Sequence, residues 1–280
     1  VVEYLHMNTH ESLGQDNIEL RTDDEALTAS INPNGAYLET LTLHGDTDLL
    51  LPRQEIGGKD RGGMPICAPI FGPGGQTGLN QHGFARNLDW QIESQQANGT
   101  ELTLSLDEAT CIQNKIPEQY AGCDMRVSFM LGNYGDEHAL TTNLKITNNS
   151  QNIIVATPGF HPYFPIGSGQ TAESVAIGDK TRSRPFNAQT PLKDSAQLPE
   201  PTGKVAFELE SEDNKTSVSI NSDTLMRYVI WSASPDKYIC VEPTLAGFAA
   251  NERSVPELEK LYGLRPRQSK EYTLQIIWRR

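Results

Sequence analysis

Apolar and polar side chains alternate with a period of two residues in segments that recur throughout this chain. Such alternation is typical of β-strands with one buried face. Asn, Gly, Pro, Asp and Ser separate the alternating segments, and an Asn-Pro-Asn-Gly turn at 32–35 joins the first two. The predicted strands are 25–31, 36–43, 100–106, 125–131, 140–149, 152–158, 204–210, 216–222, 228–234, 238–243 and 271–278.

Helical periodicity is scarce, and the one predicted helix is "VPELEKLYG", which follows Ser254. Many strands and few helices predict an all-β fold, a large antiparallel sandwich or barrel. No repeat or linker divides the 280 residues, so residues 1–280 are predicted to form a single domain. Two turn-rich segments, 57–78 and 178–203, are expected to be irregular and are candidate binding loops.

The formal net charge of −13 argues against a nucleic acid or an acidic membrane surface as partner. No stretch is apolar for the length that a membrane-spanning helix needs, and the first residues lack the basic-then-apolar order of a secretory signal. The chain is therefore expected to be a soluble, cytoplasmic protein with no membrane partner.

The four cysteines, Cys67, Cys111, Cys123 and Cys240, include no C-x-x-C pair. This spacing fits neither a zinc site nor a disulfide framework, and we expect reduced, mostly buried thiols. The six histidines are equally dispersed, so the sequence predicts no metal site.

His161 lies in "TPGFHPYF", between Pro158 and Pro162. Proline fixes its own backbone and restricts the residue before it, so the imidazole is expected to be held in place. One interpretation is a histidine that fills the edge of an aromatic core; the other is a fixed catalytic acid.

Glu242 ends the apolar strand "YICVEP", where alternation places Tyr238, Cys240 and Glu242 on one face. A semi-buried carboxyl there would have a raised pKa, in the range that suits a general base. The alternative is a carboxylate that points to water at the end of the strand.

The segment "LNQHGFARNLDW" at 79–90 gathers hydrogen-bond donors around one glycine. Gln81, His82 and Arg86 all donate, and the guanidinium fork matches paired oxygens. Arg61, in "KDRGGMP", could add a second guanidinium from the neighbouring loop. The alternative is a solvated loop whose charges pair with the many acidic residues.

Together, a fixed histidine, a strand-end glutamate and several donors suit proton transfer on a polyhydroxylated ligand. The sequence contains no G-x-S-x-G, no P-loop and no G-x-G-x-x-G that opens a helix, so hydrolase, nucleotide and Rossmann sites lack support.

Four segments in chain order, "RGGMPICAPIFGP", "QHGFARNLDW", "GFHPYF" and "YICVEP", resemble the galactose mutarotase-like enzymes, and most closely their hexose-6-phosphate 1-epimerase branch. The resemblance spans residues 61–243. It implies a β-supersandwich that interconverts the α and β anomers of an aldohexose without metal or organic cofactor. It also implies a small-molecule sugar or sugar phosphate as ligand, and a monomer or weak homodimer.

By this resemblance Glu242 is the base at the anomeric hydroxyl and His161 the acid at the ring oxygen. Gln81 and Arg86 bind substrate, Arg61 lies near its anionic or hydroxyl end, and His82 lines the cleft. "HPYF" and "APIFGP" depart from the usual segments of the family. The acidic substrate ligand expected at 175–195 is either Asp179 or Asp194.

Three functions follow in order of preference. The first is a 1-epimerase of a hexose 6-phosphate, and the second is the same chemistry on an unphosphorylated aldose such as galactose or glucose. The third is a non-catalytic sugar-binding protein of the same fold.

Overall fold

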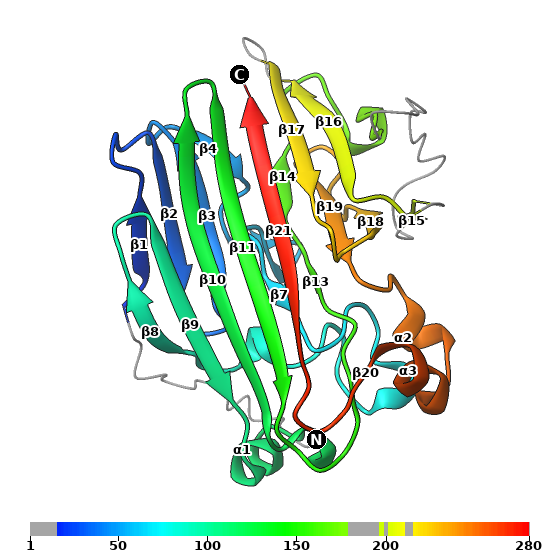
Figure 1. Ribbon diagram of the computed structural model, residues 1–280. Helices are drawn as coiled ribbons and strands as arrows, with labels where there is room; N and C mark the ends of the chain where they lie inside the picture. The colour runs from blue at the N-terminus through cyan, green and yellow to red at the C-terminus, as the bar shows by residue number, and fades with distance from the viewer. Residues whose placement is uncertain (1–15, 179–195, 199–200, 211–214, 280) are drawn as a thin grey trace, which may run out of the picture.

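A computed structural model of the protein describes residues 16–178, 196–198, 201–210 and 215–279. Within these residues the chain is mostly antiparallel β-structure, which confirms the predicted all-β fold (Figure 1). All eleven predicted strand segments contain a strand. No helix in this part of the chain is long and apolar enough to cross a membrane.

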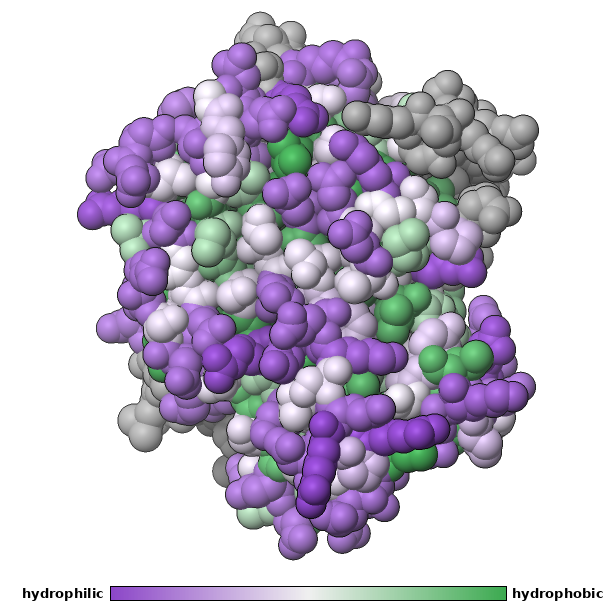
Figure 2. Space-filling view, in the orientation of Figure 1, coloured by the Kyte–Doolittle hydropathy of each residue, from purple (hydrophilic) through white to green (hydrophobic). Residues whose placement is uncertain are grey.

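A seven-stranded sheet forms the front layer in Figure 1. Its long central strands alternate between buried and partly or fully exposed residues, and the exposed face carries mainly hydrophilic and intermediate residues (Figure 2). One face of this sheet therefore contacts solvent and the other contacts the core. Its strands, in spatial order, are β16 (Lys204–Glu210), β17 (Lys215–Asn221), β21 (Ser269–Arg279), β11 (Glu137–Asn148), β10 (Cys123–Tyr134), β9 (Gly99–Ser105) and β8 (Gln91–Gln95).

Two smaller sheets lie behind the front sheet (Figure 1). The four-stranded sheet contains β1 (Ile18–Arg21), β2 (Leu27–Asn32), β3 (Tyr37–Leu43) and β4 (Thr47–Leu50). The six-stranded sheet contains β15 (Ala196–Gln197), β18 (Arg227–Trp231), β19 (Tyr238–Thr244), β13 (Gly159–Phe160) and β7 (Ile66–Cys67), with β14 (Tyr163–Pro165) also paired to β19.

The hydrophobic core joins the layers. One continuous cluster contains Val127, Leu144 and Leu274 of the front sheet together with Leu38 of β3 and Val241 of β19. All five side chains are fully buried, and each such burial contributes about 1.5–3 kcal/mol. Packing between the layers therefore fixes the position of β19, the strand that carries Glu242.

The remaining elements are short. They are the ribbons β5 (Gln54–Ile56)–β6 (Lys59–Arg61) and β12 (Ile154–Val155)–β20 (Gly263–Leu264), the helices α1 (Glu108–Gln113), α2 (Ala249–Glu252) and α3 (Val255–Tyr262), and the 3-10 turns Gly75–Thr77, Ala85–Asn87, Glu118–Tyr120 and Ala172–Ser174.

The predicted helix is confirmed as α3. The Ser254 backbone N–H donates to the Glu257 carboxylate in a capping box, which fixes the start of the helix. The sequence did not predict α1, which Asp107 caps by accepting from the Thr110 N–H. The segment 57–78, expected to be irregular, contains β6 and β7.

Candidate active site

A cavity of about 500 Å³ lies beside the six-stranded sheet. Its wall brings together side chains from β6, β18, β19, the β13–β14 connection and the 81–86 segment. All six residues that the sequence singled out line this cavity, namely Arg61, Gln81, His82, Arg86, His161 and Glu242.

Glu242 is placed by β19, whose seven residues are all buried. The strand pairs with β18 on one side and with β13 and β14 on the other. The Glu242 carboxyl is 2% exposed, so the alternative of a carboxylate that points to water is wrong. Burial raises the pKa of Glu242 well above its ordinary value, because the charged form loses its hydration.

His161 lies between β13 and β14, directly across from Glu242. Gly159 pairs with Thr244 and Tyr163 pairs with Cys240, so the continuous antiparallel register sets His161 opposite Glu242. The Nε2 atom of His161 is 3.5 Å from Oε1 of Glu242. The two groups that the sequence predicted as acid and base therefore form one buried pair.

Aromatic rings hold the His161 imidazole. It stacks on Tyr163 at a centroid distance of 4.7 Å, and Trp231 and His82 contact it edge-on at 5.7 and 5.6 Å. Burial comes first, followed by the nearby His82 ring and the Arg86 guanidinium, and together they lower the pKa of His161 well below 6.5. The ring both fills an aromatic edge and lines the cavity, so the two interpretations of this histidine are compatible.

His82 is held by two contacts with Gly72. The backbone N–H of His82 donates to the Gly72 carbonyl at 2.8 Å, and the backbone N–H of Gly72 donates to Nδ1 of the His82 ring at 3.2 Å. An Nδ1 that accepts a hydrogen bond belongs to a neutral imidazole, and burial lowers the pKa of His82 to about 3. His82 is therefore a neutral part of the wall.

Gly83 allows the 81–86 segment to approach the six-stranded sheet closely. Its φ is +72°, and a Cβ there would lie 2.2 Å from the Ala68 carbonyl oxygen. The Phe84 N–H also donates to that oxygen, at 3.0 Å. Arg86 Nη2 donates to the Gln81 carbonyl at 3.2 Å, and both residues line the cavity, which favours an ordered wall over a solvated loop.

Two guanidinium groups reach the cavity. Arg61 lies over the Trp231 ring, 4.7 Å from its centroid, in a cation–π contact. The buried Nε atoms of Arg61 and Arg86 have no hydrogen-bond partner within the described part of the chain. Both arginines therefore keep donor capacity for a ligand with oxygen acceptors.

A group of possible metal ligands was not apparent from sequence spacing. Ligand atoms of His161, Cys240 and Glu242 lie within 4.8 Å of one another. Such a donor set is compatible with a zinc ion. However, Arg61 and Arg86 lie close enough to lower the pKa of His161, and their positive charges would repel a metal cation at this place. All four cysteines are free and buried, as predicted.

The sequence did not indicate several other cavity residues, among them Arg53, Lys59, Asp60 and Trp231. The run Lys59–Asp60–Arg61 directly after a Gly-Gly pair is a signal that could have indicated a charged hairpin. Asp179 and Asp194, the two candidates for an acidic ligand, lie outside the described residues.

A family profile described as aldose 1-epimerase matches residues 16–252. A protein of Escherichia coli (strain K12), named "Putative glucose-6-phosphate 1-epimerase", is 28% identical over 216 residues, which cover 74% of this chain and 67% of the relative. A Salmonella typhimurium protein of the same name is 28% identical over 164 residues, 56% of this chain and 52% of that relative.

Solved structures show the same fold. A galactose mutarotase-like protein from Lactobacillus casei has a TM-score of 0.75 at 18% identity, and the match covers 94% of this chain and 99% of that one. A galactose mutarotase related enzyme from Lactobacillus acidophilus has a TM-score of 0.74 at 20% identity, with 94% and 97% coverage. The predicted galactose mutarotase-like fold is thus confirmed, and the chain belongs to the aldose 1-epimerase family, whose members are isomerases.

Proposed function

We propose that the protein interconverts the α and β anomers of a hexose 6-phosphate. The observation that carries this proposal is the pairing of a buried imidazole and a buried carboxyl, 3.5 Å apart, in a cavity with a cationic wall. Ring opening of a sugar hemiacetal needs one group that accepts a proton and one that donates a proton at the same time. His161 and Glu242 form such a pair in the wall of the cavity.

The reaction proceeds through the open-chain aldehyde. Glu242 accepts the proton of the anomeric hydroxyl while His161 donates a proton to the ring oxygen, and the bond between C1 and the ring oxygen breaks. The aldehyde turns about the C1–C2 bond. The same two proton transfers in reverse then close the ring on the other face, so both groups return to their starting state.

The pair needs only one proton between its two members. Burial favours the neutral forms of both groups, which places this proton on Glu242. The 3.5 Å approach lets the proton reach Nε2 of His161 once the substrate favours the charged forms. A bound phosphate does so, because its negative charge offsets the guanidinium groups that lower the pKa of His161.

The charge around the cavity supports a phosphorylated substrate. The whole chain carries −13, yet Arg53, Lys59, Arg61 and Arg86 line this cavity with two acidic residues, Asp60 and Glu242. Guanidinium groups match phosphate oxygens well. The name of the E. coli relative is in line with this substrate.

An unphosphorylated aldose is the second candidate. The family profile is that of aldose 1-epimerases, and uncharged donors such as Gln81 also line the cavity. Anomer exchange followed by NMR with phosphorylated and free hexoses side by side distinguishes the two. Equal exchange of both sugars supports the plain aldose 1-epimerase, and binding without exchange supports a non-catalytic sugar-binding protein.

A further inference from the structure

The ribbon β5–β6 brings three consecutive charged residues to the cavity. Gly57 and Gly58 form its two-residue turn with φ of +62° and +72°, values that glycine adopts without strain. Ile56 pairs with Lys59 across the ribbon, and Gln54 pairs with Arg61. Since side chains alternate along a strand, Lys59 and Arg61 project from the same face.

That face is turned toward the cavity. Ile56, the cross-strand partner of Lys59, packs against the cluster of Tyr163, Tyr238 and Cys240, and Arg61 lies over Trp231. Lys59 lines the cavity and is exposed, whereas Arg61 lines the same cavity and is partly buried. The ribbon therefore contributes one partly buried and one exposed cation to the cavity wall.

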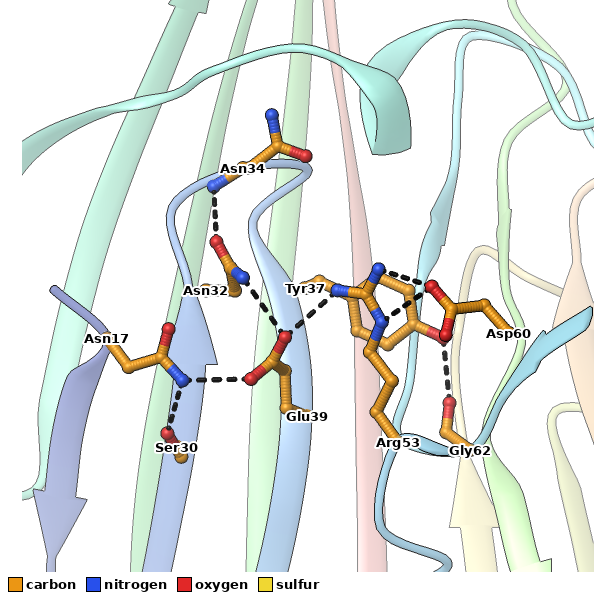
Figure 3. A network of polar contacts seen from close by, with 9 residues as sticks. All are labelled: Asn17, Ser30, Asn32, Asn34, Tyr37, Glu39, Arg53, Asp60 and Gly62. Atoms are coloured by element: carbon orange, nitrogen blue, oxygen red, sulfur yellow. Dashed lines mark hydrogen bonds and ion pairs between the residues drawn. The ribbon is translucent and has the colours of Figure 1, made fainter. Parts of the chain in front are cut away.

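Arg53, just before β5, already forms two ion pairs within the protein. Its Nη1 donates to Glu39 Oε1 at 2.9 Å and its Nη2 to Asp60 Oδ2 at 2.6 Å, and its guanidinium lies 4.5 Å from the Tyr37 ring centroid (Figure 3). Two carboxylates thus share this one guanidinium. Arg53 ties the ribbon to β3 and has little charge left for a ligand.

A second bond holds the same open end of the ribbon from the β6 side. The Tyr37 hydroxyl donates to the Gly62 carbonyl at 2.8 Å, directly after β6 (Figure 3). Glu39 is itself held by the side-chain amides of Asn17 and Asn32, at 2.8 and 3.0 Å. These contacts hold the ribbon at its open end and at Asp60, the neighbour of Lys59.

Lys59 differs from Arg53 in that it forms no ion pair with any described residue. An exposed ammonium in a cavity wall, held by a ribbon and without a carboxylate partner, is suited to the phosphate of a sugar whose anomeric end lies at His161 and Glu242.

We propose that Lys59 is a specificity-determining residue that binds the phosphate of the substrate, and that Arg53 is a positioning residue that holds the β5–β6 ribbon so that Lys59 and Arg61 face the cavity. This inference rests on the proposed function, because it assigns the group that recognises the phosphate of that substrate.

The first experiment compares wild type with Lys59→Gln, Lys59→Arg and Lys270→Gln. Lys270 is exposed in β21 and outside the cavity, so its substitution makes the same change of net charge elsewhere. Binding of inorganic phosphate is measured by calorimetry, and KM is measured for hexose 6-phosphate and for free hexose.

We expect Lys59→Gln to weaken phosphate binding and to raise KM for hexose 6-phosphate by about tenfold, with little change in KM for free hexose. Lys59→Arg should restore most of the loss, and Lys270→Gln should behave as wild type. If Lys59→Gln binds phosphate as wild type does, or if Lys270→Gln loses as much, the assignment of Lys59 is overturned.

The second experiment tests positioning with Arg53→Lys, which keeps the charge and loses the planar fork. We expect KM for hexose 6-phosphate to rise about threefold in the wild-type background and clearly less in the Lys59→Gln background, where only the part of the effect that acts through Arg61 remains. An equal loss in both backgrounds would show that Arg53 does not act by placing Lys59, and would contradict the positioning role.

The two proposals fail in different ways. If wild-type enzyme prefers hexose 6-phosphate and Lys59→Gln keeps that preference, the assignment of Lys59 is wrong. The proposed function still stands in that case. Wild-type enzyme that shows no preference for the phosphorylated sugar contradicts the proposed function. If it also fails to bind inorganic phosphate, the inference falls with it.

Discussion

Nε2 of His161 lies 3.5 Å from Oε1 of Glu242, and both side chains are buried. The register that pairs Tyr163 with Cys240 and Gly159 with Thr244 holds the two groups opposite each other, so their separation depends on backbone pairing between strands. An acid and a base fixed in this way need no rearrangement when substrate binds, which reduces the cost of reaching the transition state.

Glu242→Gln should reduce anomer exchange by about 10³-fold, because the amide cannot accept the anomeric proton and general-base catalysis is worth about 10²–10⁴. Exchange rates from saturation-transfer NMR test this. A variant that exchanges anomers at nearly the wild-type rate would rule out Glu242 as the base.

The same variant should not lose stability at neutral pH. The pKa of Glu242 is raised in the folded state, so the folded protein binds a proton more tightly than the unfolded chain and loses stability as pH rises above the unfolded pKa. Glutamine removes this penalty. A melting temperature equal to or about 2 °C above wild type is expected, and a large decrease would show that the carboxyl stabilises the fold.

The specificity constant should show a bell-shaped pH profile. Activity requires one proton in the His161–Glu242 pair. Because burial lowers the pKa of His161, the second proton binds only at pH well below 6.5, which gives the acid limb. Because burial raises the pKa of Glu242, the pair keeps its single proton well above pH 4.5, and its loss gives the alkaline limb. A flat profile with chemistry rate-limiting would contradict this assignment.

Arg86→Ala, alone or with Arg61→Ala, should reduce turnover of hexose 6-phosphate far more than that of free hexose. Each charge-assisted bond to phosphate is worth about 1.5–3 kcal/mol, so the loss is on the order of tenfold to a hundredfold. Added salt should weaken the advantage of the phosphate in wild type. The exposed Arg265, which is not part of the cavity wall, provides the control Arg265→Ala. Equal losses with both sugars would favour the unphosphorylated substrate.

Gly83→Ala should destabilise the protein much more than Gly135→Ala. Both glycines have φ near +70°, so the backbone penalty of about 1 kcal/mol is shared. A Cβ at Gly83 meets the Ala68 carbonyl oxygen at 2.2 Å, whereas one at Gly135 meets no atom within 4 Å. Urea unfolding should show an additional loss of about 2 kcal/mol or more for Gly83→Ala. Similar losses would mean that the close approach of the 81–86 segment is not tight.

The sequence predicted the long strands because their alternation is strong, as in β10 and β11. It missed β8 because all five residues of this edge strand are exposed and carry no apolar face. It also missed α1, whose six residues are too few to show a helical period.

The site was predicted in part. Four motifs in chain order indicated six of the lining residues, because the functional side chains of each motif lie within a few positions of one another. The link from Arg53 to Glu39 could not be predicted, because it depends on how the β5–β6 ribbon lies against β3. The opposition of His161 and Glu242 likewise depends on strand register, which local pattern does not encode.

Anomer exchange by wild-type protein tests the proposed role of the His161–Glu242 pair. It is measured by saturation-transfer NMR at the C1 proton after subtraction of the uncatalysed rate. Glucose 6-phosphate and glucose are compared at equal concentrations below saturation. The His161–Glu242 pair in a cationic cavity predicts catalysed exchange of both sugars, with glucose 6-phosphate about tenfold faster or more. Exchange of neither sugar above the uncatalysed rate, or equal exchange of both, would contradict this account.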